Sequence, residues 1–251
     1  QINGVDFVLP FRFSEGAWQL GTRGPISLRI AEVVNQVTVK NIAADLQGAY
    51  PWSENNPLLL SDVSADLLGG KIIMQQLRMP QHDPALLRVQ NISSSELISA
   101  VNPKQFAMSG PVSGALPLWL DNEKWIIKDG WLTNPGPMTL RIDKDTADAV
   151  VKDNMAAGAA INWLRYMEIS HSWTKINLDN LGVLTMQSTV TGNSRVDGKV
   201  GTVNLNYTHE ENVFTLWRSL RFGDNLQAWL EQNAALPETH CPEGKECEEQ
   251  Q

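Results

Sequence analysis

The sequence has few of the residues on which catalytic and metal sites usually depend. Only two cysteines and four histidines occur among 251 residues. It contains no GxSxG nucleophile elbow, HExxH zinc pair, GK[ST] phosphate loop or DxDxDG calcium loop. His171 lies within an alternating strand pattern and His209 just before a predicted helix, and histidines in such positions are most often structural. We therefore predict a protein without catalytic residues, a bound metal or a cofactor.

The sequence also lacks a long apolar segment. No stretch approaches the roughly 20 apolar residues that a membrane-spanning helix needs. The chain starts at Gln1, with no initiator methionine and no signal sequence. We therefore expect a piece of a longer polypeptide, in which any membrane anchor lies outside this segment.

Positive charge is not concentrated anywhere along the chain. The net charge is −8, and residues 237–251 supply half of it with five Glu and one Lys. A chain without a clustered basic face cannot neutralise a row of phosphates, so nucleic acid is not an expected partner. Residues 233–251 are predicted to be a solvated acidic tail.

Both cysteines lie in this acidic tail. Cys241 and Cys247 are separated by five residues, and such a pair is typical of a small disulfide loop in an oxidising compartment. His240 precedes Cys241 and allows a metal site as the alternative. The tail has no CxxC or HxxxH spacing, which favours the disulfide.

Strand patterns fill residues 1–142. Apolar and polar residues alternate at 26–30 and at 63–67, which is the period of a strand with one apolar face. Gly69-Gly70 predicts a hairpin turn, and residues 121–123 predict another. Asn134-Pro135-Gly136-Pro137 predicts a turn before a third strand. Together these signals indicate a β-meander.

The period of the apolar residues changes after residue 142. Residues 143–165 repeat apolar residues every three or four positions, which predicts a helix. Alternation returns in residues 166–232 as three strands, followed by two amphipathic C-terminal helices. The serines at 93–95 predict only a loop. The expected fold is therefore mainly β, with one interrupting helix and two C-terminal helices.

Tryptophan is the most informative residue type, with nine copies. Trp119, Trp125 and Trp131 fall in or beside one predicted hairpin, where they offer large apolar area and one polar group each. The simplest interpretation is core packing inside a closed β-sandwich. Alternation alone does not distinguish that core from one apolar face of an open sheet.

The order of several short motifs resembles that of a known family. Residues 109–118 read SGPVSGALPL, and residues 125–132 read WIIKDGWL. They are similar to the GxxxGxLPL and IxDGxL pattern of AsmA-like bacterial envelope proteins. Residues 203–213, followed by a Leu-rich segment, and the LLGGKI sequence at 67–72 resemble the YdbH branch. The resemblance covers roughly residues 26–232, and only the NPGPMTLRI segment at 134–142 departs from it.

This resemblance implies a bent, open antiparallel β-sheet that runs across the periplasm from the inner membrane. Its concave face would be an apolar groove for phospholipid acyl chains, and this chain would be the end near the outer membrane. The apolar residues on the expected face of their strands are the candidate lipid-groove residues: Leu67, Ile72, Met74, Leu116, Leu118, Leu120, Trp125, Ile127, Leu140 and Ile142.

The resemblance also implies a partner, a small outer-membrane lipoprotein. An open sheet ends in a strand whose backbone groups can pair with another chain by β-strand addition. The strand at 200–207 has no proline and alternates apolar with polar residues. The candidate edge consists of Val200, Thr202, Val203, Asn204, Leu205 and Tyr207. Alternatively, this strand is central and the partner docks on the C-terminal helices.

Two other functions compete with phospholipid transport. A closed β-sandwich could serve as an envelope scaffold or binding module, and an unrecognised hydrolase is a more distant third. An older family label, dicarboxylate transport, would require a compact pocket with converging Arg or Lys residues. The sequence shows no such clustering.

Overall fold

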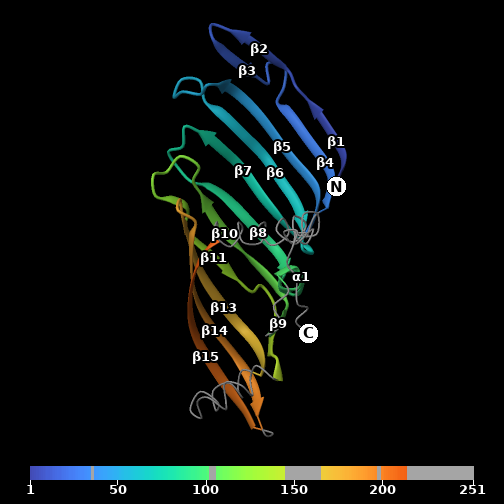
Figure 1. Cartoon of the computed structure of the whole chain (residues 1–251), viewed down its shortest axis with the longest axis vertical. Helices are drawn as coiled ribbons and strands as arrows, with labels where there is room; N and C mark the ends of the chain where they lie inside the picture. Colours follow the sequence, from blue (N-terminus) through green and yellow to red (C-terminus); the bar gives the residue numbers. More distant parts are fainter. Residues whose placement is uncertain (35–36, 102–105, 145–164, 197–198, 214–251) are drawn as a thin grey trace, which may run out of the picture.

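One antiparallel sheet of fifteen strands dominates the computed structural model, which describes residues 1–34, 37–101, 106–144, 165–196 and 199–213 (Figure 1). One helix, α1 (Ser94–Val101), lies between β8 and β9 in the chain. The strands are β1 (Ile2–Val8), β2 (Phe11–Ser14), β3 (Ala17–Leu20), β4 (Ile26–Val34), β5 (Thr38–Tyr50), β6 (Leu58–Leu67), β7 (Gly70–Met79), β8 (Ala85–Ser93), β9 (Phe106–Ser109), β10 (Pro111–Leu118), β11 (Trp125–Thr133), β12 (Met138–Ile142), β13 (Tyr166–Asp179), β14 (Val183–Val196) and β15 (Lys199–Asn212).

Strands that are close in sequence are mostly neighbours in the sheet. β4 to β8 pair in chain order, and β10 pairs with β8 and β11. β13 pairs with β11 and β14, and β14 pairs with β15. The β2–β3 hairpin is attached through β3 to the end of β5. Because every described strand belongs to this one sheet, the mainly β, open antiparallel prediction is confirmed. Two packed sheets, as in a sandwich, are not what the described residues form.

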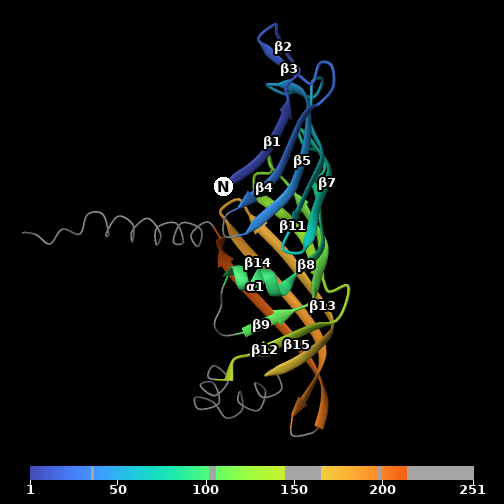
Figure 2. The same ribbon diagram turned by 90° about the vertical axis from the view of Figure 1, so that its right-hand side faces the viewer.

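Bulges at four Asn or Asp residues bend the strands. Asn41, Asp62, Asn91 and Asp129 have φ angles of 50°, 51°, 51° and 55°, a region that Asn and Asp tolerate better than other L-residues. Beside each of them the register with a neighbouring strand shifts. Bulges increase local twist and bend, and Figure 2 shows that the sheet is bowed instead of flat.

The predicted turn between β6 and β7 is present but begins one residue earlier than expected. Leu68 and Gly69 have φ angles of 48° and 71°, and Leu67 lies opposite Gly70. Two positive φ angles are what a tight two-residue hairpin requires. Gly70 is therefore the first residue of β7 and not part of the turn.

The expected loop at residues 93–95 is wrong, because these serines start α1. The Ser93 hydroxyl accepts a hydrogen bond from the Glu96 N–H at 3.3 Å, as an N-cap residue does. The Ser94 hydroxyl donates to the Gly110 carbonyl at 2.8 Å. This second bond ties the helix to the connection between β9 and β10.

The predicted turn at Asn134–Pro137 is a bend and not a reversal. β11 and β12 lie on the same side of β13, so the chain continues in one direction along that strand. Asn134, which is 9% exposed, links this bend to β13. Its Nδ2 donates to the Gly136 and Ser170 carbonyls, and its Oδ1 accepts from the Ser172 N–H at 2.6 Å and hydroxyl at 2.9 Å.

The remaining helix predictions fall outside the described residues. They are the helix at 143–165, whose central part is not described, and the two C-terminal helices beyond residue 213. The acidic tail with Cys241 and Cys247 also lies there. No described helix is long and apolar enough to cross a bilayer.

Replacing Asn134 with Ala should lower the free energy of unfolding by roughly 1–3 kcal/mol, because the partly buried Ser172 N–H loses its acceptor. Urea denaturation would measure the change. Asn55→Ala, at an exposed loop position, is the matched control and should change stability by less than about 0.5 kcal/mol. Equal effects of the two substitutions would contradict the role assigned to Asn134.

Candidate apolar binding face

One face of the sheet carries an unbroken series of apolar side chains across its strands. Residues directly opposite each other in neighbouring antiparallel strands share a face. Val63 lies opposite Met74, Met74 opposite Leu87, and Leu87 opposite Leu116. We call this side the apolar face; on its central strands it includes Leu60, Val63, Ala65, Leu67, Ile72, Met74, Leu77, Leu87, Val89, Leu116, Leu118, Ile127, Leu132, Ile176 and Leu178.

Bulges keep the apolar residues on one side where simple alternation would turn them away. Leu60 and Val63 are three positions apart and would point to opposite faces of a regular strand. The bulge at Asp62 lies between them, and both pack against the same cluster of Met74, Leu77 and Ala85. A strict two-residue period therefore understates how continuous the apolar face is.

Two buried clusters mark the most crowded parts of this face. Met74 and Ala85, each 4% exposed, pack with Leu118 from β10. Met167, fully buried, packs with Val190 and Val203 from the next two strands. Most of the buried apolar residues that the structure describes lie on this face. Such crowding is expected on the inner side of a bowed sheet, because its side chains converge.

Most of the candidate groove residues fall on the apolar face. Met74 and Leu118 meet in one cluster, and Leu140 packs against the other. Leu67, Ile72, Leu116 and Ile127 share the face through the strand register, and Ile142 continues the alternation of Leu140 on β12.

Two candidate groove residues and one of the tryptophans lie off this face. Leu120 is beyond the end of β10 and 58% exposed. The register with β13 shifts between Trp125 and Ile127. Ile127 lies opposite Leu178 on the apolar face, but Trp125 lies opposite the adjacent residue, Asp179, which faces the other way. Trp131 lies opposite Ala115 and stacks on Trp173 with ring centroids 5.0 Å apart. The Asp129 bulge separates Trp131 from Ile127.

The other side of the sheet, which we call the polar face, carries rows of charged residues. Lys40 Nζ is 3.8 Å from Glu32 Oε1, and Lys71 Nζ is 3.4 Å from Asp66 Oδ1. Asn41 donates a 2.7 Å hydrogen bond to Asp66, and this bond, with Lys71 nearby, holds the Asp66 pKa below its ordinary value. These groups neutralise one another across adjacent strands.

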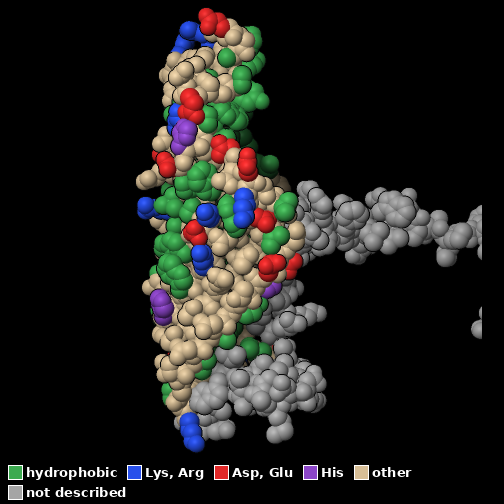
Figure 3. Space-filling model, turned by 90° about the vertical axis from the view of Figure 1, so that its left-hand side faces the viewer, with side chains coloured by type: hydrophobic (Ala, Val, Ile, Leu, Met, Phe, Trp, Pro, Cys, Tyr) green, Lys and Arg blue, Asp and Glu red, His purple; other side chains and the backbone are tan. Residues whose placement is uncertain are grey.

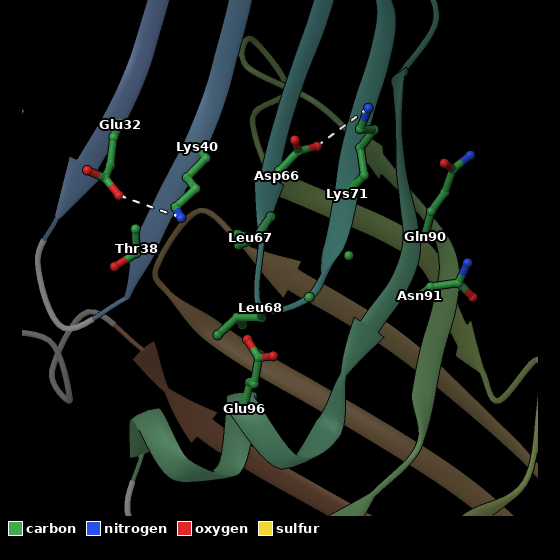
Figure 4. Close-up of a pocket in the computed structure, with 12 residues that line it drawn as sticks. Glu32, Thr38, Lys40, Asp66, Leu67, Leu68, Lys71, Gln90, Asn91 and Glu96 are labelled. Atoms are coloured by element: carbon green, nitrogen blue, oxygen red, sulfur yellow. Dashed lines mark ion pairs between the residues drawn. The ribbon is translucent and has the colours of Figure 1, made fainter. Parts of the chain in front are cut away.

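The same charged rows line a cavity of about 810 Å³ beside α1 (Figure 4). Glu96 points into it from α1, and Gln90 and Asn91 complete the wall. Both lysines of the lining are paired with carboxylates, and a third acidic group, Glu96, is close by. A dicarboxylate would meet more negative than positive charge here, so the cavity does not favour that older function.

The described residues contain no group of three or more His, Cys, Asp or Glu side chains that could hold a metal ion. His171 lies in β13 and His209 in β15, where His209 stacks on Tyr207 with ring centroids 6.0 Å apart.

A family model described as "YdbH-like: Intermembrane phospholipid transport protein YdbH" matches residues 1–235. The chain belongs to this family. It is 80% identical over 251 residues to the probable phospholipid transport protein YdbH of Escherichia coli (strain K12). The match covers all of this chain and 29% of that relative, a C-terminal part of it. No solved structure matches the chain. The family is one of transport proteins and not an enzyme class.

At one end of this YdbH-like sheet the apolar side chains are exposed and aromatic. Trp18 contacts Phe11 and Phe13, with ring centroids 5.4 and 5.1 Å apart, and Tyr50 contacts Trp52 at 5.7 Å. All five are 39–58% exposed. Our sequence reasoning missed this group. The available signal was alternation on both sides of Glu15-Gly16, a two-residue turn with positive φ angles.

At the other end lies β15, which carries the candidate partner edge. β15 pairs with β14, and no other described strand pairs with it. Val203 and Leu205 lie opposite Gly192 and Val190, so they extend the apolar face. The other residues of the candidate edge are Val200, Thr202, Asn204 and Tyr207; Val200 and Tyr207 are 62% and 52% exposed.

Met167 and Leu120 provide a direct test of this face. Met167→Ala should cost roughly 2–5 kcal/mol of stability, because it opens a cavity between strands. Leu120→Ala should change stability by less than about 0.5 kcal/mol, because the side chain already lies in solvent. Thermal unfolding followed by circular dichroism would compare the two. A large loss for Leu120→Ala would place that residue inside the packed face after all.

Proposed function

We propose that this chain is a segment of a conduit that carries phospholipids between the inner and outer membranes, with the acyl chains on its apolar face. The observation that supports this most is one open sheet with a continuous apolar face from β6 to β15. The Escherichia coli relative is named as a probable phospholipid transport protein, which agrees with such a surface.

The apolar face suits acyl chains for a simple physical reason. Each methylene group moved from water to an apolar surface contributes about 0.8 kcal/mol. An acyl chain therefore gains from any row of Leu, Ile, Val and Met side chains, without specific hydrogen bonds. The lipid headgroup stays in water at the rim of the sheet. The summed contribution of many methylene groups binds the lipid to such a surface. Because no position on it is preferred, the lipid can move along it.

An open sheet serves this purpose better than a closed core. In a sandwich the rows around Leu118 and Ile127 would face a second sheet and leave no room for lipid. All described strands instead belong to one sheet. The crowding of Met74 and Met167 supports assigning the apolar face to the inner side of the bow seen in Figure 2.

The location we propose follows from this function. A conduit between two membranes lies in the periplasm, and this C-terminal segment would be its end near the outer membrane. The inner-membrane anchor would lie in another part of the longer protein. In the oxidising periplasm, Cys241 and Cys247 would form the disulfide predicted from their spacing.

A small outer-membrane lipoprotein is the partner that we propose at β15. A strand added to β15 would extend the sheet, and with it the apolar face, beyond Val203 and Leu205. An edge strand without proline is a template for such pairing.

Photo-crosslinking in the complete protein tests the conduit. A photoreactive amino acid at Leu118 or Ile127 should capture phospholipid, detected as ³²P-labelled protein after growth in labelled phosphate. The matched control is Arg88, which lies opposite Ala115 on the polar face and should capture none. Crosslinks to protein alone at Leu118 and Ile127 would instead indicate a closed sandwich.

Proline substitution tests the partner edge. Alternate residues of an antiparallel strand direct their N–H groups to opposite edges. Thr202→Pro or Asn204→Pro should abolish co-purification of the acylated lipoprotein, yet leave the thermal midpoint nearly unchanged. Thr191→Pro, in the next strand inward and opposite Asn204, should unfold this part of the sheet. Retained lipoprotein binding in both edge variants, or loss of the fold in both, would refute the assignment.

A further inference from the structure

The polar face of the β14–β15 hairpin differs from that of the central strands. Three cross-strand pairs of Thr and Asn lie side by side on it, and we call them the Thr–Asn ladder. The oxygen–oxygen distances are 3.1 Å for Thr189–Asn206, 2.9 Å for Thr191–Asn204 and 3.3 Å for Thr202–Asn193. The corresponding pairs on β4 to β7 are ionic, such as Lys71 with Asp66.

The direction of these hydrogen bonds leaves polar groups available at the sheet edge. Thr189 and Thr191 on β14 donate to the Oδ1 atoms of Asn206 and Asn204 on β15. The side-chain Nδ2 groups of these two asparagines are not used in the ladder. Each Nδ2 group has two N–H donors. If another strand paired with β15, its side chains on the polar face would lie beside these donors.

The middle of the edge, between Lys199 at one end of β15 and Glu210 and Glu211 at the other, lacks the features that usually prevent strand addition. Proteins protect such edges with proline or with charged side chains, especially lysine. Residues 200–208 contain neither a proline nor a charged residue. In the lower third of Figure 3, at the height of β13 to β15, the surface is mostly tan, the colour of neutral polar side chains and backbone.

We infer that the strand which adds to β15 is neutral on this side and carries Asn, Thr or Ser residues that continue the Thr–Asn ladder. Its alternate residues are apolar and continue the row of Val203 and Leu205. This inference rests on the proposed addition of a partner strand and specifies its side chains. Asn, Thr and Ser offer an acceptor oxygen to each Nδ2 donor of Asn204 and Asn206, whereas a lysine would bring only further donors.

β15 itself has this pattern, since residues 202–208 read TVNLNYT. A second copy of the chain could therefore occupy the edge, and the experiment has to separate that occupant from a different protein. We favour a separate strand, because two copies joined at β15 would close the conduit on itself instead of extending it towards a membrane.

Synthetic nine-residue peptides and the complete protein provide the test. One peptide alternates Ile or Val with Asn and Thr; the other has the same apolar residues with alternating Lys and Glu, also of zero net charge. Fluorescence polarisation should show at least about tenfold tighter binding of the Asn/Thr peptide, as two additional hydrogen bonds would give.

A charge exchange identifies the residues responsible. The double variant Asn204→Asp with Asn206→Asp keeps acceptors for Thr189 and Thr191 but removes both Nδ2 donors. It should lose about tenfold in affinity for the Asn/Thr peptide and gain affinity for a peptide with Lys at the facing positions. Unchanged affinities of this variant would overturn the inference.

The outcomes separate this inference from the proposed function. If the unaltered protein binds the Asn/Thr and Lys/Glu peptides equally, strand addition stands and the side-chain inference fails. If it binds neither peptide, strand addition at β15 fails as well. Concentration-dependent self-association in sedimentation, abolished by the double Asp variant, would identify a second copy as the occupant and overturn the choice of a separate partner.

Discussion

The structure depends on a backbone hydrogen-bond ladder that continues through a single layer. Each internal strand satisfies its N–H and C=O groups through its two neighbours. With no second described sheet, a side chain is covered mainly by others on its own face. Apolar residues are therefore concentrated on one face, and charged or amide pairs on the other. Met167, for example, is buried in a cluster with Met138 and Ile169, against which Val190 and Val203 pack.

Alternation in the sequence predicted the strands and much of the apolar face, whereas the open sheet was implied only by the family resemblance. Leu116 and Leu118, and Ile72 and Met74, occupy the predicted face because their strands are regular there. Simple alternation does not give the side-chain direction next to bulges. The Asp129 bulge puts Trp131 on the polar face, and a register shift separates Trp125 from Ile127. A single Asp or Asn inside a strand pattern gives little warning of a positive φ angle.

Other features were unpredictable because they depend on distant parts of the chain. The local sequence around Asn134 is that of a simple turn, and only its hydrogen bonds to Ser170 and Ser172 distinguish the bend from a reversal. Likewise, Ser93 caps a helix of only eight residues, too short for a clear helical period. Both residues satisfy backbone groups where regular pairing stops. Local sequence carries little information about where that happens.

The pairing of each strand with its immediate neighbours has an evolutionary consequence. In a closed core an added strand disturbs contacts on every side, but here a hairpin such as β6–β7 contacts mainly β5 and β8. Such quasi-one-dimensional architectures have stabilities that are nearly sums of local terms. Duplication or loss of a hairpin would change the length of the molecule and leave its cross-section the same. The length of such a sheet can therefore change in steps of one hairpin.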